Sequence, residues 1–147
     1  MLTAHAGIAV FVIGVTMVKG METSNEVSMR VGDTTTAGGY TFLLTQLEEI
    51  KGPNYVAEQG TFEVTRGDKK IATMRPQKRL YTVQNMPMTE AAIDRGFTHD
   101  LYVSMGEAGN DGAWIVRVQH KPFIGWIWAG ALIMALGGFL AASDRRY

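Results

Sequence analysis

The stretch that decides the fold is FIGWIWAGALIMALGGFLAA, residues 123–142, which contains no charged side chain. As an α-helix rising about 1.5 Å per residue, it would be about 30 Å long, the thickness of a bilayer's hydrocarbon core. Trp126 and Trp128 near its start are typical of a membrane interface, and Arg145 and Arg146 follow its end as a cationic stop. The alternative is a buried helix of a globular core, but so long an uncharged run favours a transmembrane helix over residues 122–143.

A second apolar segment opens the chain. LTAHAGIAVFVIGVTMV, residues 2–18, would form a helix about 26 Å long, at the short end for a membrane crossing. A signal peptide is the alternative, but the segment has no basic start and no small-x-small cleavage site after it. We therefore predict a transmembrane helix over residues 1–18. Its abrupt start suggests that Met1 lies inside or near the start of a helix in a longer protein.

The charges are confined almost entirely to the middle of the chain. Twenty-five of the 28 charged residues lie between Lys19 and Lys121, so residues 19–121 form a polar block between the two apolar segments. The positive-inside rule places the tail at 144–147, with its two arginines, in the cytoplasm. Two crossings of the bacterial inner (cytoplasmic) membrane then put the block in the periplasm. Its own cations do not count, because the rule applies to loops shorter than about 60 residues.

Composition excludes several classes of function. The 147 residues carry 14 Lys+Arg and 14 Asp+Glu, so there is no cationic excess for binding nucleic acid. Cysteine is absent, which removes disulfides, cysteine-ligated metals and thiol nucleophiles. No HExxH motif, phosphate-binding loop or Gly-x-Ser-x-Gly elbow occurs, and we assign no catalytic residue.

The polar block reads as short β-strands separated by turn signals. Apolar and polar residues alternate along several runs, and Gly-Asp, Gly-Pro-Asn and Arg-Gly-Asp sequences separate them. This pattern predicts a small antiparallel barrel or sandwich, with an OB-like barrel as the favoured form. Only TEAAID, residues 89–94, reads as a helix, with Thr89 as its N-cap. The predicted strands are 27–31, 40–44, 55–57, 61–65, 71–74, 80–83, 101–105 and 114–118.

His5 is the residue best suited to chemistry, because an ionisable group inside an apolar helix is costly and normally faces other helices or a ligand. Neutral imidazole is a common axial ligand of haem iron. Ala9, Val12 and Thr16 share its helical face, and small residues in the segment would let a flat macrocycle or another helix come close. The alternative is a capping or solvated histidine near a helix end.

Small residues also recur in the second apolar segment at a 4-3-4 spacing, which places them on one helical face. Such a stripe lets another helix approach closely, so we expect helix partners there, with lipid as the alternative. The residues of this stripe are Ala131, Ala135, Gly138 and Ala142.

Three further features have weaker support. Two histidines in the polar block have no second ligand at a fixed spacing, and we expect them on the surface. A Met-Pro-Met run offers soft thioethers to Cu(I), but packing explains it more simply. An acidic pair reads as a solvated edge. These residues are His99 and His120, Met86 and Met88, and Glu48 and Glu49.

The sequence resembles the C-terminal part of the CcmF family, the large membrane subunits of bacterial cytochrome c haem lyases. The resemblance covers nearly the whole chain, and the block around MPMTEAAID makes it specific. The stretches that carry it are AHAGIAVFVIGVT (4–16), GGYTF (38–42), GPNY (52–55), KRLYTVQNMPMTEAAIDRG (78–96), DLYVSMGE (100–107), GAWIVRV (112–118) and KPFIGWIWAGALIMALGGFLAASDRRY (121–147).

This resemblance implies a function in attaching haem, delivered by a periplasmic carrier, to the two cysteines of an apocytochrome CxxCH motif. It also implies a resident haem b between two transmembrane histidines, and His5 in its AHAG context matches one of them. The second of those histidines, the external-loop histidines and the tryptophan-rich motif of the family have no counterpart here. The chain alone is therefore not expected to perform the lyase reaction.

The resemblance further implies partners: the remaining helices of the haem lyase, other maturation subunits, a haem chaperone and apocytochrome c. The alternative from another class is a cofactor-free bitopic membrane scaffold whose periplasmic β domain binds a partner protein. Loss of the low-spin haem spectrum on substitution of His5 would distinguish the haem-lyase hypothesis from the scaffold hypothesis.

Overall fold

The computed structural model describes residues 2–143, which form two compact units. The helical unit consists of residues 2–22, 95–100 and 121–143. The sandwich unit consists of residues 23–94 and 101–120. Each unit therefore gathers segments that are distant in the sequence, and each is described separately below.

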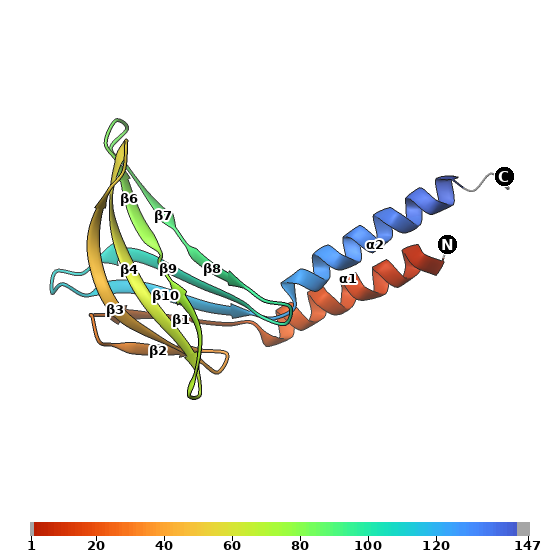
Figure 1. The fold of residues 1–147 in the computed structure, drawn as a ribbon, viewed down its shortest axis with the longest axis horizontal. Helices are drawn as coiled ribbons and strands as arrows, with labels where there is room; N and C mark the ends of the chain where they lie inside the picture. Colours follow the sequence, from red (N-terminus) through yellow and green to blue (C-terminus); the bar gives the residue numbers. More distant parts are fainter. Residues whose placement is uncertain (1, 144–147) are drawn as a thin grey trace. The chain divides into compact units, whose positions relative to one another are not determined.

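The helical unit is built on two antiparallel helices, α1 (Leu2–Met21) and α2 (Ile124–Ser143), which run side by side in Figure 1. The two apolar segments thus form helices, as predicted, and both are long and apolar enough to cross a membrane. Only 17% of the most apolar window of α1 and 11% of that of α2 are buried within the protein. Most of the surface of both helices is therefore exposed within this chain.

Glycines bring the two helix backbones into direct contact. A Cβ atom at Gly130 would lie 2.5 Å from the backbone nitrogen of Phe11, and one at Gly137 would lie 2.5 Å from that of Ala4. On α1, Gly7 and Gly14 also cannot be replaced by a larger residue without a shift, because Cβ atoms there would meet backbone atoms of α2. Such close approach is available only to small residues, and it lets the side chains of Met134 and Ile127 pack against Gly7 and Gly14.

The sandwich unit contains two antiparallel sheets (Figure 1). One sheet has four strands in the order β1-β10-β9-β8, and the other has the order β2-β3-β4-β6-β7 with β5 also paired to β4. Of the two predicted forms, barrel or sandwich, the structure thus has the sandwich. The strands are β1 (Thr23–Met29), β2 (Thr34–Ala37), β3 (Tyr40–Lys51), β4 (Tyr55–Arg66), β5 (Lys69–Met74), β6 (Gln77–Tyr81), β7 (Met86–Glu90), β8 (Ala92–Arg95), β9 (Asp100–Ala108) and β10 (Trp114–Lys121).

The inward faces of both sheets supply the core, because alternate residues along a strand point to the same side. Phe42, Leu44, Phe62 and Val64 come from β3 and β4, and all four are fully buried. The strands β9 and β10 contribute a matching set from the four-stranded sheet. These residues are Leu101, Val103, Val116 and Val118.

The long strand β4 organises the larger sheet. It pairs with β3 along one edge, while β5 and β6 share its other edge in succession. The change from β5 to β6 occurs at Gly60, whose backbone nitrogen donates to the carbonyl oxygen of Pro76 (3.1 Å). A side chain at Gly60 would meet the Phe62 ring and the Met105 sulfur, so the core requires glycine there.

The predicted helix over residues 89–94 is wrong. These residues lie in β7 and β8, and Thr89 is a strand residue whose hydroxyl donates to the carbonyl oxygen of Met105 (3.3 Å) rather than capping a helix. Pairing with β6 brings Thr89 opposite Lys78, so sheet contacts override the local helical preference of the Glu-Ala-Ala sequence. The short strand β2 was also missing from the predicted set; its alternate residues Thr35 and Ala37 are buried.

The glycine contact between the helices predicts that Gly130→Leu destabilises the helix pair. The new side chain would meet the backbone of Phe11, and overpacking of this kind costs about 1–3 kcal/mol or more. Thermal unfolding of the detergent-solubilised chain measures the effect. Gly138→Leu is the matched control, because a Cβ atom there meets no described atom within 4 Å. Equal unfolding temperatures for the two variants would contradict the packing described here.

In the sandwich, Phe62→Ala is expected to cost about 3–5 kcal/mol, because it leaves a cavity between the sheets. The matched phenylalanine is Phe97, which is 78% exposed, and Phe97→Ala should change the free energy of unfolding by no more than about 0.5 kcal/mol. Urea titration followed by circular dichroism measures both. Similar losses in the two variants would show that the core is not centred on Phe62.

Candidate functional site

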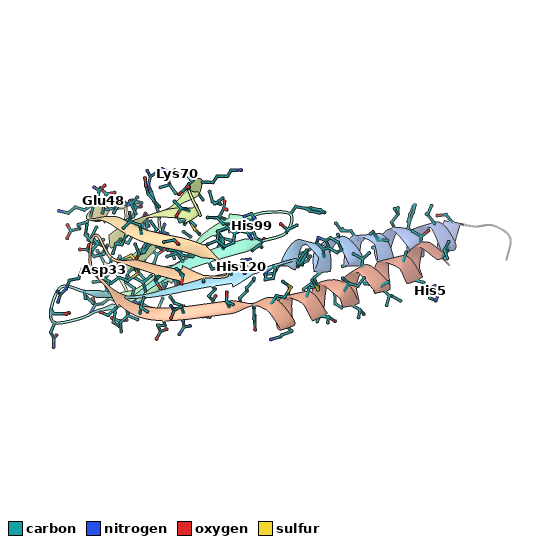
Figure 2. The ribbon with its side chains drawn as sticks, turned by 90° about the horizontal axis from the view of Figure 1, so that it is seen from below. His5, Asp33, Glu48, Lys70, His99 and His120 are labelled. Carbon is teal, nitrogen blue, oxygen red and sulfur yellow. The ribbon has the colours of Figure 1, made fainter. Side chains whose placement is uncertain are left out.

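The predicted ligand, His5, lies near the start of α1 on the side that faces away from α2 (Figure 2). The α2-facing side of α1 carries Gly7, Phe11 and Gly14, whose backbones meet α2. At 3.6 residues per turn, His5 lies on the opposite side of the helix from this contact. Its side chain is exposed at the surface of the chain, and Thr16 on the same face is exposed too.

The side chains around His5 on this face are small or apolar, or have their polar group hydrogen-bonded to the helix backbone. Ala9, one turn along, is exposed and small, and Val12 is 53% exposed. Thr16 donates its hydroxyl to the carbonyl oxygen of Val12 (2.8 Å), so its polar group is satisfied within the helix. Among the side chains His5, Ala9, Val12 and Thr16 of this face, the imidazole of His5 is therefore the group suited to ligating a metal.

The small-residue stripe of α2 is not the surface that meets α1. That contact uses Ile127, Gly130, Met134 and Gly137. Each of the last three is followed directly by a stripe residue, so the stripe lies about 100° further round the helix. Ala131 is half-buried, and the rest of the stripe is exposed: Ala135, Gly138 and Ala142. The prediction that this stripe packs against other helices stays a prediction.

A pocket of about 350 Å3 lies within the helical unit, away from the His5 face. It is open to the surface, and three segments line it: α1, the loop over residues 95–100 and the first turns of α2. We call it the Trp126 pocket. Its lining residues are Val10, Gly96, Phe97, Gly125, Trp126 and Ala129. Sequence reasoning missed it; the only signal was a phenylalanine following the Arg-Gly turn at 95–96, and nothing in the sequence linked it to α2.

The remaining histidines have structural surroundings rather than the surface positions predicted for them. His120 is half-buried, its ring lies 5.4 Å from that of Tyr40, and a side chain at Gly38 would overlap it. His99 is half-buried beside Gly96, whose backbone nitrogen donates to its carbonyl oxygen (2.7 Å).

The other sequence candidates are not assembled into a site. Met86 and Met88 are both partly exposed on β7, and within residues 2–143 no three His, Cys, Asp or Glu side chains gather as a metal site would require. Glu48 accepts a hydrogen bond from Gln59 (2.9 Å), whereas Glu49 pairs with Lys51 (3.9 Å). Neighbouring strand residues point to opposite faces, so the two carboxylates do not act as a pair.

The sandwich unit also carries a pocket of about 310 Å3 that is lined by residues of β4, β6, β7, β9 and β10 and is mostly apolar. Lys78 pairs with Glu107 (2.9 Å), and Arg79 pairs with Glu90 (3.4 Å) and lies over the ring of Tyr55. A hydrogen bond to Tyr81 raises the pKa of the Arg79 guanidinium, so this cation is permanent at any physiological pH.

Another ionic contact of the sandwich unit ties the β9–β10 turn to the residue that follows β1. Arg30 donates to Asp111 (2.6 Å), and this hydrogen bond, with another from the backbone of Ala113, lowers the pKa of the Asp111 carboxyl. The lowered pKa means that the contact is complete above the ordinary carboxyl range and is lost as the pH falls through the folded-state value. Because both side chains are exposed, its contribution to stability is small.

Comparisons with known proteins agree with this architecture. The CcmF C-terminal beta-sandwich family matches residues 20–122. The cytochrome c-type biogenesis protein CcmF of Pseudomonas aeruginosa is 52% identical over the whole chain, and that of Escherichia coli is 42% identical. A solved structure of the cytochrome c haem lyase CcmF superposes with a TM-score of 0.73 at 13% identity, over 92% of this chain and 23% of the other.

The share of each relative that this chain covers is also informative. This chain spans 22% of the Pseudomonas aeruginosa protein and 23% of the Escherichia coli protein. The matched family segment coincides with the sandwich strands and the connections that lead into the two helices. The chain therefore belongs to the CcmF family, in which it corresponds to the C-terminal β-sandwich and the helices on either side of it.

Proposed function

We propose that the chain is the C-terminal part of a cytochrome c haem lyase, contributing to haem handling and to covalent attachment of haem to apocytochrome c. Membership of the CcmF family is the observation that carries this proposal. Relatives named for cytochrome c biogenesis, matched over the whole of this chain, support it. Since the chain spans 22–23% of those relatives, the activity is proposed for the longer protein, and no catalytic residue is assigned to this chain.

Within that function, His5 is proposed as one axial ligand of a resident haem b. The geometry fits, because the imidazole lies on the face of α1 that does not meet α2, with the small Ala9 one turn away. A single histidine supplies one of two axial positions, so the second comes from outside this chain. When bound, the haem would supply one-electron redox chemistry. His5 would hold and orient it, and the apolar face around it would exclude water.

The membrane topology is part of the same proposal. Helices α1 and α2 would cross the bacterial inner membrane, and the sandwich unit would lie in the periplasm. The length and low burial of both helices support the crossing. The tail at 144–147, proposed to be cytoplasmic, lies outside the described residues.

The partners proposed are the other helices of the haem lyase, further maturation subunits, a haem chaperone and apocytochrome c. The exposed small-residue stripe of α2 suits close contact with another helix. The pocket of the sandwich is mostly apolar and also has Lys78, Arg79 and Glu107 in its lining, so it suits a protein surface that carries both apolar and charged side chains. This pocket also supports the second candidate function, a cofactor-free membrane scaffold whose sandwich binds a partner protein.

Substitution of His5 separates the two functions. In the complete subunit, His5→Ala should abolish most of the low-spin haem absorption, because the iron loses one of its axial ligands. Absorption spectra of the purified, reduced protein measure this. His99→Ala is the matched control, since that histidine lies outside the proposed site, and it should leave the spectrum intact. A normal spectrum in the His5 variant would exclude the ligand assignment and favour the scaffold.

The stripe is tested by assembly rather than by spectra. The triple variant Ala131→Leu, Ala135→Leu, Gly138→Leu should reduce recovery of α2 with the remaining helices, because bulky side chains prevent close helix contact. Co-purification of a tagged C-terminal part with the rest of the subunit, co-expressed as a separate chain, measures this. Exposed Leu132→Ala, Leu136→Ala and Leu140→Ala serve as the control set. Unimpaired recovery of the triple variant would mean that the stripe faces lipid.

A further inference from the structure

The pocket of about 310 Å3 in the sandwich unit is open to the surface and is lined by residues of both sheets. We call it the Trp114 pocket. Even-numbered residues of β4 face the other sheet, since Phe62 lies in the core and a Cβ atom at Gly60 would meet the sulfur of Met105. Side chains alternate along a strand, so Glu58 also faces inward, and it lines the pocket.

Most of the wall of the Trp114 pocket is apolar. Val56 and Leu80 are direct cross-strand neighbours on β4 and β6, and Trp114 comes from β10 of the other sheet. Val56 and Trp114 are half-buried, while Leu80 is 43% exposed. This apolar surface is therefore accessible, and covering it with aliphatic carbon would be favourable.

Glu58 places a carboxylate in this wall. It is half-buried, and among residues 2–143 its carboxylate has no hydrogen-bond donor and no ion-pair partner. Its cross-strand neighbour on β3 is Glu49, and like charges directly opposite each other destabilise a sheet. Glu49 pairs with Lys51 (3.9 Å). Glu58 is thus left beside a second carboxylate without a cation of its own.

The nearest cation in the ladder, Lys78, is bonded elsewhere. It lies opposite Glu58 in the pairing of β4 with β6, but its ammonium donates to Glu107 (2.9 Å) and to the hydroxyl of Thr89 (3.3 Å). Arg79, the next residue, faces the opposite side of the sheet, where its guanidinium is already paired. The inward-facing charges of the pocket are therefore two carboxylates and one ammonium, which leaves one positive charge to be supplied.

We propose that the Trp114 pocket binds a lysine or arginine side chain presented by a partner protein, with its cationic end at Glu58 and its aliphatic stem along the apolar wall. Long basic side chains combine an apolar stem with a charged end, as this wall requires. The indole of Trp114 adds an aromatic face, to which cations are attracted. The proposal rests on the partner binding proposed above for the sandwich, and it specifies the chemistry of the group recognised.

The test uses Trp114 as a fluorescent reporter in the whole chain, in an uncharged detergent. Trp126→Phe with Trp128→Phe leaves Trp114 as the only tryptophan. Trp114→Phe with Trp126→Phe leaves Trp128, which is 70% exposed on α2 and reports adsorption of a probe to the micelle.

The probes are two peptides that differ in one charge. One is acetyl-Ala-Leu-Arg-Leu-Ala-amide, and the other carries citrulline, which has the shape of arginine without its charge. The arginine peptide should change the emission of Trp114 saturably and should bind about fivefold more tightly than the citrulline peptide, as expected for one ion pair at a half-buried carboxylate. Trp128 should show no saturable change with either peptide.

Two variants of the Trp114 form separate the carboxylate of the pocket from general charge. Glu58→Gln should remove the preference for the arginine peptide. Glu63→Gln is the matched control and should retain it, because Glu63 lies on the same strand, faces the opposite side of the sheet and pairs with Lys70 (2.9 Å). Equal affinities of the two peptides for the chain with Glu58 intact, or a preference that survives Glu58→Gln, would overturn the proposal.

The haem function is measured separately, by the low-spin haem absorption of the complete subunit, because His5 and the Trp114 pocket belong to different units. Normal haem absorption with no preference for the arginine peptide would overturn the pocket proposal and leave the haem function standing. A clear arginine preference in a subunit without haem would support the pocket and favour the scaffold function.

Discussion

The helical unit depends on backbone contact between α1 and α2 at glycines. Gly7 and Gly14 on one helix, and Gly130 and Gly137 on the other, each lie where a single added carbon would overlap the partner backbone. At these four positions the seam accepts only glycine, and the side chains of Ile127 and Met134 pack against Gly14 and Gly7. The outward position of His5 and the exposure of the α2 stripe both follow from it.

Sequence periodicity identified the main architecture because the physical signals were strong and local. Two uncharged segments became helices, and alternating runs such as 61–65 became strands. The seam between the helices could not be assigned, since small residues occupy two adjacent faces of α2 and only the position of α1 distinguishes them. The TEAAID segment failed for a different reason. Thr89 and Glu90 belong to β7, which pairs with β6, and Ala92 begins β8, which pairs with β9, so pairing with distant strands overrides the segment's own preference.

The features of the candidate sites also differ in whether the sequence could predict them. His5 is recognisable from sequence because the energetic cost of an imidazole in an apolar helix is a local property. The Trp126 pocket is not, because Val10, Phe97 and Gly125 come from three segments that meet only after folding. The buried indole N–H could be detected only once the surroundings of Trp126 were known.

The outer strands of the two sheets have a consequence for how the sandwich meets other proteins. β2 and β8 each have four residues, and β7 contains Pro87, which lacks an N–H. Short strands and proline are the devices that discourage a foreign strand from extending a sheet. The Met-Pro-Met run thus disfavours pairing of a foreign strand with this edge of the sheet, and this effect requires no metal. Recognition of this sandwich is thereby biased toward its side chains, and away from pairing with main-chain groups at the edges formed by β2, β7 and β8.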